Sequence, residues 1–483
     1  MYRKIFTLTK HSVVYGFGYI LTRSIGFVLL PVHTNYLSTA EYGIVGLLFA
    51  SLAILNVIYR YGIDVAFLRF FILEEDKIEK KKVFSTAFLS ILGSGILFSL
   101  IMNIFPQFLS QAIFQDQSYV LLIRLSAGIL IADALVEIPF RVLRAEEKSL
   151  SFCVLKFLNV AVNFGLNILF IIHLQKGIEG VFLANLISAL FTLITVFPII
   201  FKWIKLSVVL KVLKELLGFG IPYIPSLLSV IIMGQIGRFF LDRMVSAEAT
   251  GIFNAGYKLG MFMSLVVTAF RFAWHPFFLS VSKEDNAKDI YSKVLTYFIV
   301  IIGFIFLVIC FFLEEIVHIN VFGVTLFGEK FLPGISIVPI VMLAYVAYGM
   351  YINFIVGIYM EKKTVYLPFI TGSGAAAAII SNFIFVPLWG ITGAAVSTFI
   401  AYMSMATILY IINQKLYTIQ YEFSKIFKIT IFYTLIYLLG ILIFNDLVII
   451  KICLLLCILP FLWIFGILNK EEKDIILSFF YKK

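Results

Sequence analysis

Long apolar stretches alternate with short polar ones along the whole chain. Fourteen runs of about 20 mostly apolar residues are separated by segments that carry most of the charges. A helix needs a run of this length to cross a bilayer, whereas barrel strands alternate over about 10 residues. The pattern predicts membrane-spanning helices at 12–33, 43–68, 83–105, 119–142, 151–172, 180–201, 215–237, 251–278, 294–316, 336–360, 365–386, 391–413, 429–445 and 450–468.

The composition narrows the function classes. Of the 483 residues, 62% are hydrophobic and only 13% are charged, against about 25% charged in soluble proteins. Fourteen spans leave no segment long enough for a soluble domain, which needs about 50 residues. No fused ATPase, kinase or glycosyltransferase domain is therefore expected. The net charge of +11 is typical of basic membrane-protein loops, and no nucleic-acid partner is expected.

The basic residues predict the orientation of the chain. If the N-terminus lies inside, 27 of the 38 lysines and arginines fall in cytoplasmic segments and seven within spans. Only four fall outside, namely Lys176, Arg238, Arg243 and Lys330. This bias predicts an even number of spans, with both termini in the cytoplasm.

An internal repeat divides the spans. Residues 38–44 resemble 246–252 at an offset of 208, and residues 177–187 resemble 390–400 at an offset of 213. The repeat unit is six spans, so both copies point the same way, related by an axis along the membrane normal. We expect an all-α polytopic membrane protein with two six-helix lobes, 1–210 and 211–413, and two further helices within 414–483. This architecture is typical of secondary transporters, whose substrate site lies between the lobes.

Three segments near the N-terminus resemble a known family. They are Arg-Ser-Ile-Gly-Phe at 23–27, Asn-Tyr-Leu-Ser-Thr-Ala-Glu-Tyr-Gly at 35–43 and the segment 61–71. They are similar to the polysaccharide (O-antigen, Wzx-type) flippases of the multidrug/oligosaccharidyl-lipid/polysaccharide exporter (MOP) superfamily. The later Gly-Ile-x-Gly pairs and the fourteen-span layout fit the same family.

The resemblance implies a substrate and a location. A flippase of this kind moves a polyprenyl-diphosphate-linked oligosaccharide to the outer leaflet of the bacterial cytoplasmic membrane, for surface polysaccharide (lipopolysaccharide) biosynthesis, by alternating access. Membrane lipids, a polysaccharide polymerase and a chain-length regulator are the partners it implies, and no cofactor is expected. Protons, sodium or the membrane potential would drive transport. A potential of 100 mV would contribute about 4–5 kcal/mol for a diphosphate with two charges.

Three cations within the spans are candidate substrate-binding residues. Arg23 lies near the middle of the first span, and Lys258 and Arg271 lie in the eighth. Each charge at the bilayer centre costs roughly 2.5–3.5 kcal/mol, and a guanidinium can bind phosphate oxygens with two hydrogen bonds. The alternatives are that Arg23 pairs with Asp133 and that Arg271 extends to the cytoplasmic interface.

Two groups of charges are candidates for pairing or for ion coupling. Arg60 and Asp64 are four residues apart in the second span, which favours an ion pair within one helix. Asp133 and Glu137 lie on one face of the fourth span, with Arg141 one turn further. Glu137 would then pair with Arg141, and Asp133 with Arg23 or Arg124. The alternative is that Asp133 binds a proton or another cation, because neighbouring carboxylates raise one pKa.

Prolines predict bends in the first helix of each lobe. Pro31 lies in the first span, and Pro222 and Pro225 lie in the seventh. A membrane helix tolerates such breaks where neighbours or water bind the freed carbonyls. The bends suit a gate, although static kinks are an equal alternative.

Rival functions remain open. A cation-coupled multidrug exporter of the same superfamily would be expected to have acids, not Arg23, in the middle of its N-lobe cavity. A lipid II flippase would differ only in substrate. A membrane polysaccharide polymerase would be an enzyme with a large outer loop, but the longest predicted outer loop is 317–335. No zinc-protease, nucleotide-binding or nucleophile-elbow motif occurs, so no catalysis is expected.

Overall fold

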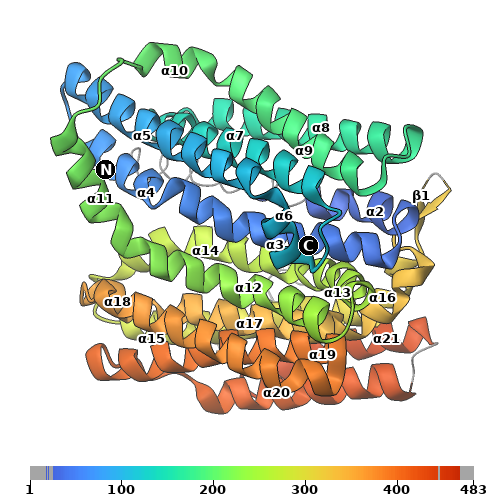
Figure 1. Cartoon of the computed structure of the whole chain (residues 1–483). Helices are drawn as coiled ribbons and strands as arrows, with labels where there is room; N and C mark the ends of the chain where they lie inside the picture. The colour runs from blue at the N-terminus through green and yellow to red at the C-terminus, as the bar shows by residue number, and fades with distance from the viewer. Residues whose placement is uncertain (1–17, 19, 21–24, 322, 444–446, 468–483) are drawn as a thin grey trace, which may run out of the picture. The chain divides into compact units, whose positions relative to one another are not determined.

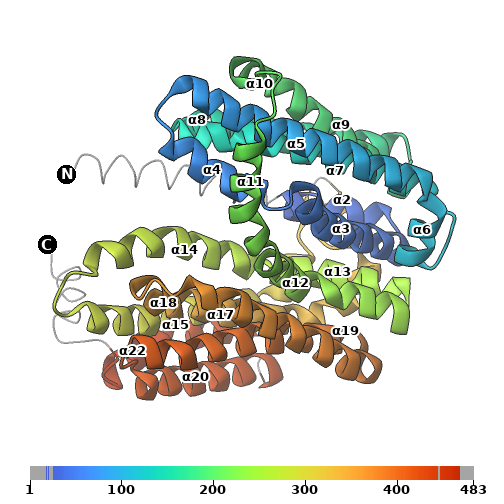
Figure 2. The same cartoon turned by 60° about the vertical axis from the view of Figure 1, so that its left-hand side comes forward.

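A computed structural model describes residues 18, 20, 25–321, 323–443 and 447–467. Ten helices in these ranges are long and apolar enough to cross a membrane. The chain is a multi-pass membrane protein, and its helices are shown in Figures 1 and 2.

The elements up to residue 203 are α2 (Leu30–Tyr36), α3 (Thr39–Arg60), α4 (Ile63–Leu73), α5 (Lys77–Ile104), α6 (Pro106–Phe114), α7 (Val120–Ala145), α8 (Ser149–Asn167), the π-helix η1 (Ile168–His173), α9 (Gly177–Thr195) and α10 (Phe197–Trp203). The next are α11 (Leu210–Gly220), the 3₁₀ helix η2 (Ile221–Tyr223), α12 (Ile224–Met244), α13 (Ala247–Gly260), α14 (Phe262–Val281), α15 (Ala287–Phe311) and α16 (Leu313–Val317). The last are β1 (Asn320–Val321), β2 (Val324–Thr325), the 3₁₀ helix η3 (Glu329–Ile337), α17 (Val338–Phe354), α18 (Val356–Met360), the 3₁₀ helix η4 (Thr364–Tyr366), α19 (Leu367–Leu416), α20 (Phe423–Leu438), the π-helix η5 (Leu439–Ile443), α21 (Val448–Leu456) and α22 (Ile458–Ile464).

Each predicted span after the first corresponds to one or more of these helices, and in one case a single helix covers two predicted spans. α7 is absent from the ten apolar helices because it carries five charged residues. α19 covers the two spans predicted at 365–386 and 391–413, which meet at Gly390, where φ is 53° and ψ is −126°. α21 and α22 together cover the last predicted span as shorter apolar helices.

Contacts between helices group the chain into two units. The first consists of Met1–Leu279 and Asn320–Leu416, and the second of Ser280–Ile319 and Tyr417–Lys483. In the second unit, α15 packs against α20 and α21. Residues 280–319 therefore group with the C-terminal helices, whereas the repeat assigns them to the second lobe. The lobe boundaries at 210 and 413 remain a prediction from the repeat.

In the first unit, α5, α7, α8 and α9 lie side by side, and α3 packs against α7 (Figure 1). α11 packs against α4 and α5 and leads through η2 into α12 (Figure 2). α12 and α17 both pack against α19. The helices of the two predicted lobes therefore meet within this unit.

The main contact between the predicted lobes is a seam of small residues between α3 and α13. A Cβ on Gly251 would overlap the carbonyl oxygen of Thr39 and would lie 3.0 Å from the backbone nitrogen of Gly43. A Cβ on Gly46 would overlap the side chain of Asn254. The two backbones approach this closely because neither glycine carries a side chain.

The predicted outer loop 317–335 is partly ordered into secondary structure. β1 and β2 form an antiparallel pair in which Asn320 is opposite Thr325. The side-chain amide of Asn35, in α2, donates to the Thr325 carbonyl at 2.8 Å and accepts from the Thr325 hydroxyl at 3.0 Å. These two strands are the only ones among the described residues.

Candidate functional site

Arg238 is buried within the first unit. It lies in α12, and only 7% of its surface is exposed. Its Nε donates to the side-chain oxygen of Asn254, and its Nη1 donates to the Gly234 carbonyl at 2.8 Å. Its guanidinium carbon lies 4.8 Å from the ring centre of Tyr257. The orientation argument counted Arg238 as a residue of an outer loop. That was wrong, because hydropathy does not distinguish a loop arginine from one buried near the end of a helix.

Lys258 lies where α13 approaches α3 and the first predicted span. Its ammonium nitrogen is 5.2 Å from the ring centre of Tyr42. A Cβ on Gly26 would lie 3.8 Å from the Lys258 Cε, so the lysine side chain reaches the first span. Asn254 joins this group to Arg238, because its amide also donates to the Tyr42 carbonyl at 3.3 Å.

Arg271 is connected to the same region through four tyrosines, called here the tyrosine run. Its Nη1 donates to the Tyr348 hydroxyl at 3.4 Å. The ring of Tyr348 lies 5.3 Å from that of Tyr402, which lies 5.9 Å from that of Tyr345. The hydroxyls of Tyr345 and Tyr257 are 3.1 Å apart. The run therefore extends from Arg271 to the ring that covers Arg238.

None of these three cations belongs to an ion pair among the described residues. Aromatic rings, hydroxyls and amides hold Arg238, Lys258 and Arg271, and such partners stabilise a cation without neutralising it. The positive charge of this region therefore stays available to an anion.

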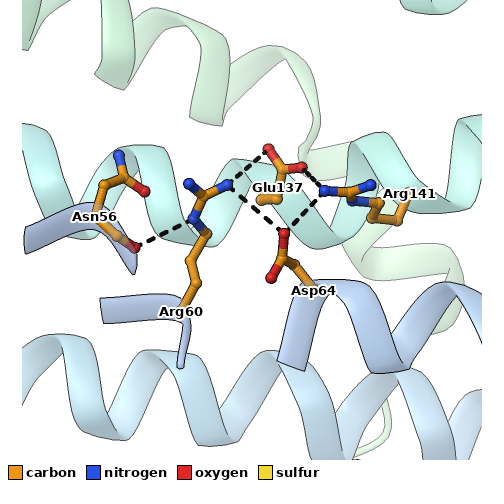
Figure 3. Close-up of polar contacts among 5 residues, drawn as sticks. All are labelled: Asn56, Arg60, Asp64, Glu137 and Arg141. Atoms are coloured by element: carbon orange, nitrogen blue, oxygen red, sulfur yellow. Dashed lines mark hydrogen bonds and ion pairs between the residues drawn. The ribbon is translucent and has the colours of Figure 1, made fainter. Parts of the chain in front are cut away.

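Four charges in the first lobe form a closed network instead (Figure 3). Arg141 Nη2 lies 2.8 Å from Asp64 Oδ2 and 2.7 Å from Glu137 Oε1. Arg60 Nη1 lies 3.7 Å from Asp64 Oδ2 and 3.6 Å from Glu137 Oε2. Two cations and two anions leave the network neutral.

The predicted ion pair between Arg60 and Asp64 is present, but its two residues do not lie in one helix. Arg60 is the last residue of α3, and Asp64 is near the start of α4. The predicted span 43–68 is broken between them, because Tyr61 and Gly62 have φ angles of 33° and 78°. A Cβ on Gly62 would overlap the carbonyl oxygen of Gly220, so the break lies against the end of α11. Arg60 and Asp64 therefore meet across a break, and Asp64 lies closer to Arg141.

Asp133 has none of its expected partners among the described residues. No ion pair joins it to Arg124. Arg23, the other expected partner and a candidate for substrate binding, lies outside the described residues. Asp133 instead lines a cavity of about 310 Å³ that Lys156 of α8 also lines.

The three prolines lie where one helical segment passes into the next. Pro31 is in the first turn of α2, directly after a turn at Leu29. Pro222 lies in η2, between α11 and α12, and Pro225 lies in the first turn of α12. Their role in a gate remains a prediction.

Sequence reasoning missed two of the charged residues described above, and it singled out neither Asn254 nor the tyrosine run. Arg238 was assigned to a loop, and Lys156 was not singled out among the charges within spans. A sequence signal existed for the cavity, since Asn159 and Asn163, which both line it, are four residues apart on one face of α8. No group of three or more potential metal ligands occurs among the described histidines, cysteines, aspartates and glutamates.

Comparisons with known proteins agree with this fold. The family model described as "Polysaccharide biosynthesis protein" matches residues 8–282. The chain belongs to this family. No curated protein matches the chain in sequence.

Solved structures of similar fold come from transporters. The lipid II flippase MurJ, in an inward closed conformation, has a TM-score of 0.75 at 15% identity, over 96% of this chain and 100% of MurJ. A MATE family multidrug resistance transporter of the MOP superfamily, facing inward, has a TM-score of 0.61 at 16% identity, over 84% and 95%. The D35N mutant of the Vibrio cholerae MATE transporter VcmN has a TM-score of 0.55 at 14% identity, over 86% and 96%. The chain thus has the two-lobe helical fold of the MOP superfamily.

Proposed function

We propose that the chain is a flippase that moves a polyprenyl-diphosphate-linked oligosaccharide from the inner to the outer leaflet of the bacterial cytoplasmic membrane. The observation that carries the proposal is the group of cations on α12, α13 and α14 that has no described carboxylate partner. The proposal places both termini in the cytoplasm and makes a polymerase and a chain-length regulator natural partners.

The charge balance favours an anionic substrate. Each charge at membrane depth costs roughly 2.5–3.5 kcal/mol unless a partner or water compensates it. In the first lobe, Arg60 and Arg141 are compensated by Asp64 and Glu137. Arg238, Lys258 and Arg271 have no such compensation from described carboxylates, so an anion that binds beside them recovers part of the cost. A diphosphate offers several oxygens to a guanidinium and an ammonium.

Family membership supports a substrate that contains sugars. The family model that matches the chain is described as "Polysaccharide biosynthesis protein", and the similarly folded MurJ is described as a lipid II flippase. Both descriptions fit a lipid-linked, sugar-bearing anion. A cationic drug would meet repulsion from the three cations, which makes a multidrug exporter the weaker candidate. The similarly folded proteins are described as a flippase and as transporters, which makes the polymerase alternative weaker still.

A binding measurement on the purified, full-length protein tests this proposal. A fluorescent polyprenyl-diphosphate oligosaccharide is titrated against the wild type, Lys258→Gln and Arg271→Gln. Losing one charged hydrogen bond costs about 1.5–3 kcal/mol, so each variant should bind roughly 10–150-fold more weakly. Lys77→Gln is the matched control, because Lys77 is exposed at the start of α5. Equal affinity in all four proteins, or tighter binding of a cationic dye, would refute the proposal.

A further inference from the structure

A pocket lies at one end of the predicted first lobe, among the starts of three helices. Its volume is about 360 Å³, and residues at the starts of α3, α7 and α9 line it. α9 packs against both α3 and α7. The polar side chains that line the pocket are Glu41, Ser118, Tyr119, Gln175, Lys176 and Glu179. None of the cations of the proposed substrate site lines it.

The three helix starts lie on the same side of the membrane. α3, α7 and α9 follow the predicted spans at 12–33, 83–105 and 151–172, respectively. These are the first, third and fifth spans, so each of them ends on the side opposite to the N-terminus. With the N-terminus in the cytoplasm, as the proposed function has it, the pocket opens at the outer face.

The turn before α9 is a property of the repeated scaffold, but its polar side chains are not. Gly177 and its repeat counterpart Gly390 have φ angles of 52° and 53°, and a positive φ favours glycine in both lobes. At the offset of 213, Leu388, Trp389 and Thr392 stand where the first lobe has a glutamine, a lysine and a glutamate. The turn is therefore built without these polar residues in the second lobe.

The acid at the start of α3 shows the same asymmetry. Ser38 and its repeat counterpart Ser246 both cap a helix, and each side chain accepts from the backbone N–H of the residue three positions later. That residue is Glu41 in α3 and Ala249 in α13. The serine cap therefore forms without a carboxylate in the second lobe. The polar lining points to a function that only the first lobe has.

Several charged groups of the pocket keep bonding capacity for a ligand. Glu41 Oε2 accepts from the Ser38 backbone N–H at 2.8 Å. Its Oε1 faces Gly177, where a Cβ would lie 3.2 Å away. Lys176 and Glu179 are exposed, and neither is in an ion pair with a described residue.

Tyr119 adds an aromatic surface to the pocket. Its ring centre lies 5.1 Å from that of Phe114, which is 8% exposed. A buried ring thus supports the tyrosine from one side. An aromatic ring held in this way offers an apolar surface, against which the C–H face of a pyranose can pack.

This combination of side chains fits a sugar better than a phosphate or a metal ion. Carboxylates, an amide and an ammonium can accept from and donate to neighbouring sugar hydroxyls. Two carboxylates and one ammonium leave a net negative charge, which repels phosphate. A metal ion such as calcium needs six or more oxygen ligands, and no group of three or more potential metal-ligating side chains occurs among the described residues. The volume is near the lower end of ligand pockets, about 300–1,000 Å³, which suits a mono- or disaccharide unit.

We propose that this pocket binds a neutral mono- or disaccharide unit at the outer face and holds the sugar part of the substrate after it has crossed the membrane. Sugar binding rests on the pocket alone, whereas its place after crossing rests on the proposed function. Tyr119 packs against the sugar ring, and Glu41 and Glu179 accept hydrogen bonds from its hydroxyls. The diphosphate stays away from the pocket because of the negative charge.

Saturation-transfer difference NMR tests sugar binding without any lipid-linked substrate. The full-length protein in phosphatidylcholine nanodiscs is titrated with lactose, cellobiose and N,N′-diacetylchitobiose. The wild type should bind at least one of these disaccharides. Tyr119→Leu and Glu179→Gln should each weaken that binding roughly fivefold or more, because a ring contact or a hydrogen bond to a charge is lost. Tyr119→Phe keeps the ring and should bind nearly as well as the wild type.

Glu248→Gln is the matched control. Glu248 is an exposed acid in the first turn of α13, the repeat counterpart of α3, and it does not line the pocket. This variant should bind the disaccharide like the wild type. Digalacturonic acid should bind more weakly than the neutral disaccharides, because the pocket is negatively charged. If Tyr119→Leu does not fold, the exposed Glu179 still provides the test.

Three results would overturn the sugar site. The first is a wild-type protein that binds none of the disaccharides at millimolar concentration. The second is equal binding in the wild type, Glu179→Gln and Tyr119→Leu, because the sugar would then bind elsewhere. The third is loss of binding when phosphatidylethanolamine replaces phosphatidylcholine in the nanodiscs, because a lipid headgroup would then be the occupant.

Transport separates this inference from the proposed function. Movement of the fluorescent polyprenyl-diphosphate oligosaccharide is followed in proteoliposomes that contain the wild type. If the lipid moves but disaccharide binding does not depend on Tyr119 and Glu179, the sugar site is refuted while the flippase function stands. If disaccharide binding depends on both residues but no lipid moves, the sugar site stands and the proposed function fails.

Discussion

The glycine seam between α3 and α13 gives a quantitative prediction about conformational change. In Gly251→Ala, the added methyl group would overlap the Thr39 carbonyl oxygen and lie 3.0 Å from the Gly43 nitrogen. Both are backbone atoms, so no side-chain rotation relieves the overlap. The two helices have to separate, and the substitution therefore disfavours the conformation in which the seam is closed.

The size of the effect follows from packing. Overfilling a tightly packed contact costs about 1–3 kcal/mol. Alanine also favours the helix over glycine by about 1 kcal/mol, but this gain cancels when α13 moves as a helix between the two conformations. The equilibrium between seam-closed and seam-parted states should therefore shift by about 5–150-fold toward the parted state.

The shift can be measured by the distance between spin labels at residues 36 and 245. Tyr36 and Val245 are 46% and 48% exposed and precede the starts of α3 and α13. The four native cysteines are first replaced. Gly251→Ala should enrich the longer distance. Gly93→Ala is the matched control, since a Cβ there meets nothing within 4 Å. A Gly251→Ala distance distribution identical to that of the control would refute the reasoning.

Two further predictions concern stability. Arg141→Met leaves Asp64 and Glu137 without their shortest ion pairs, so the free energy of unfolding should fall by about 3 kcal/mol. In denaturant titrations, adding Glu137→Gln should then cost less than it does alone, whereas strict additivity would contradict the network. Burial raises the pKa of Glu146, but hydrogen bonds from Lys148 and Lys202 outweigh burial and hold this pKa below its ordinary value. Glu146 therefore stabilises the fold above about pH 4.3, its pKa when unfolded, and this contribution is lost as pH falls through the lower folded value. The wild type should melt at a higher temperature than Glu146→Gln at pH 7, and the difference should shrink on acidification. A difference that grows on acidification would contradict the assignment.

Hydropathy predicts membrane helices well because an apolar run of sufficient length has few other stable structures. It does not predict breaks such as the one at Tyr61 and Gly62, because a glycine within an apolar run also occurs in unbroken, closely packed helices. The irregular helical turn at Pro222 could be predicted from the sequence, since proline removes a hydrogen-bond donor from the helix. The grouping of α15 with the C-terminal helices depends on tertiary packing, which the repeat does not encode.

The candidate site was only partly predictable, because its contacts also depend on tertiary packing. The spacing of Glu137 and Arg141 places them on one helix face, but their meeting with Asp64 depends on how α4 packs against α7. Arg238 lies near the end of an apolar run, where loop and buried arginines have the same sequence pattern. Its burial depends on Asn254, the rings of α13 and the space left by Gly46.

The most direct test of the central claim is transport by the wild-type protein. Reconstituted proteoliposomes are loaded with a fluorescent polyprenyl-diphosphate oligosaccharide, and its movement between leaflets is followed by quenching from outside. A parallel sample follows a cationic dye. The account predicts that the anionic lipid moves much faster than in protein-free vesicles, while the dye does not. Movement of the dye with no movement of the lipid would contradict it.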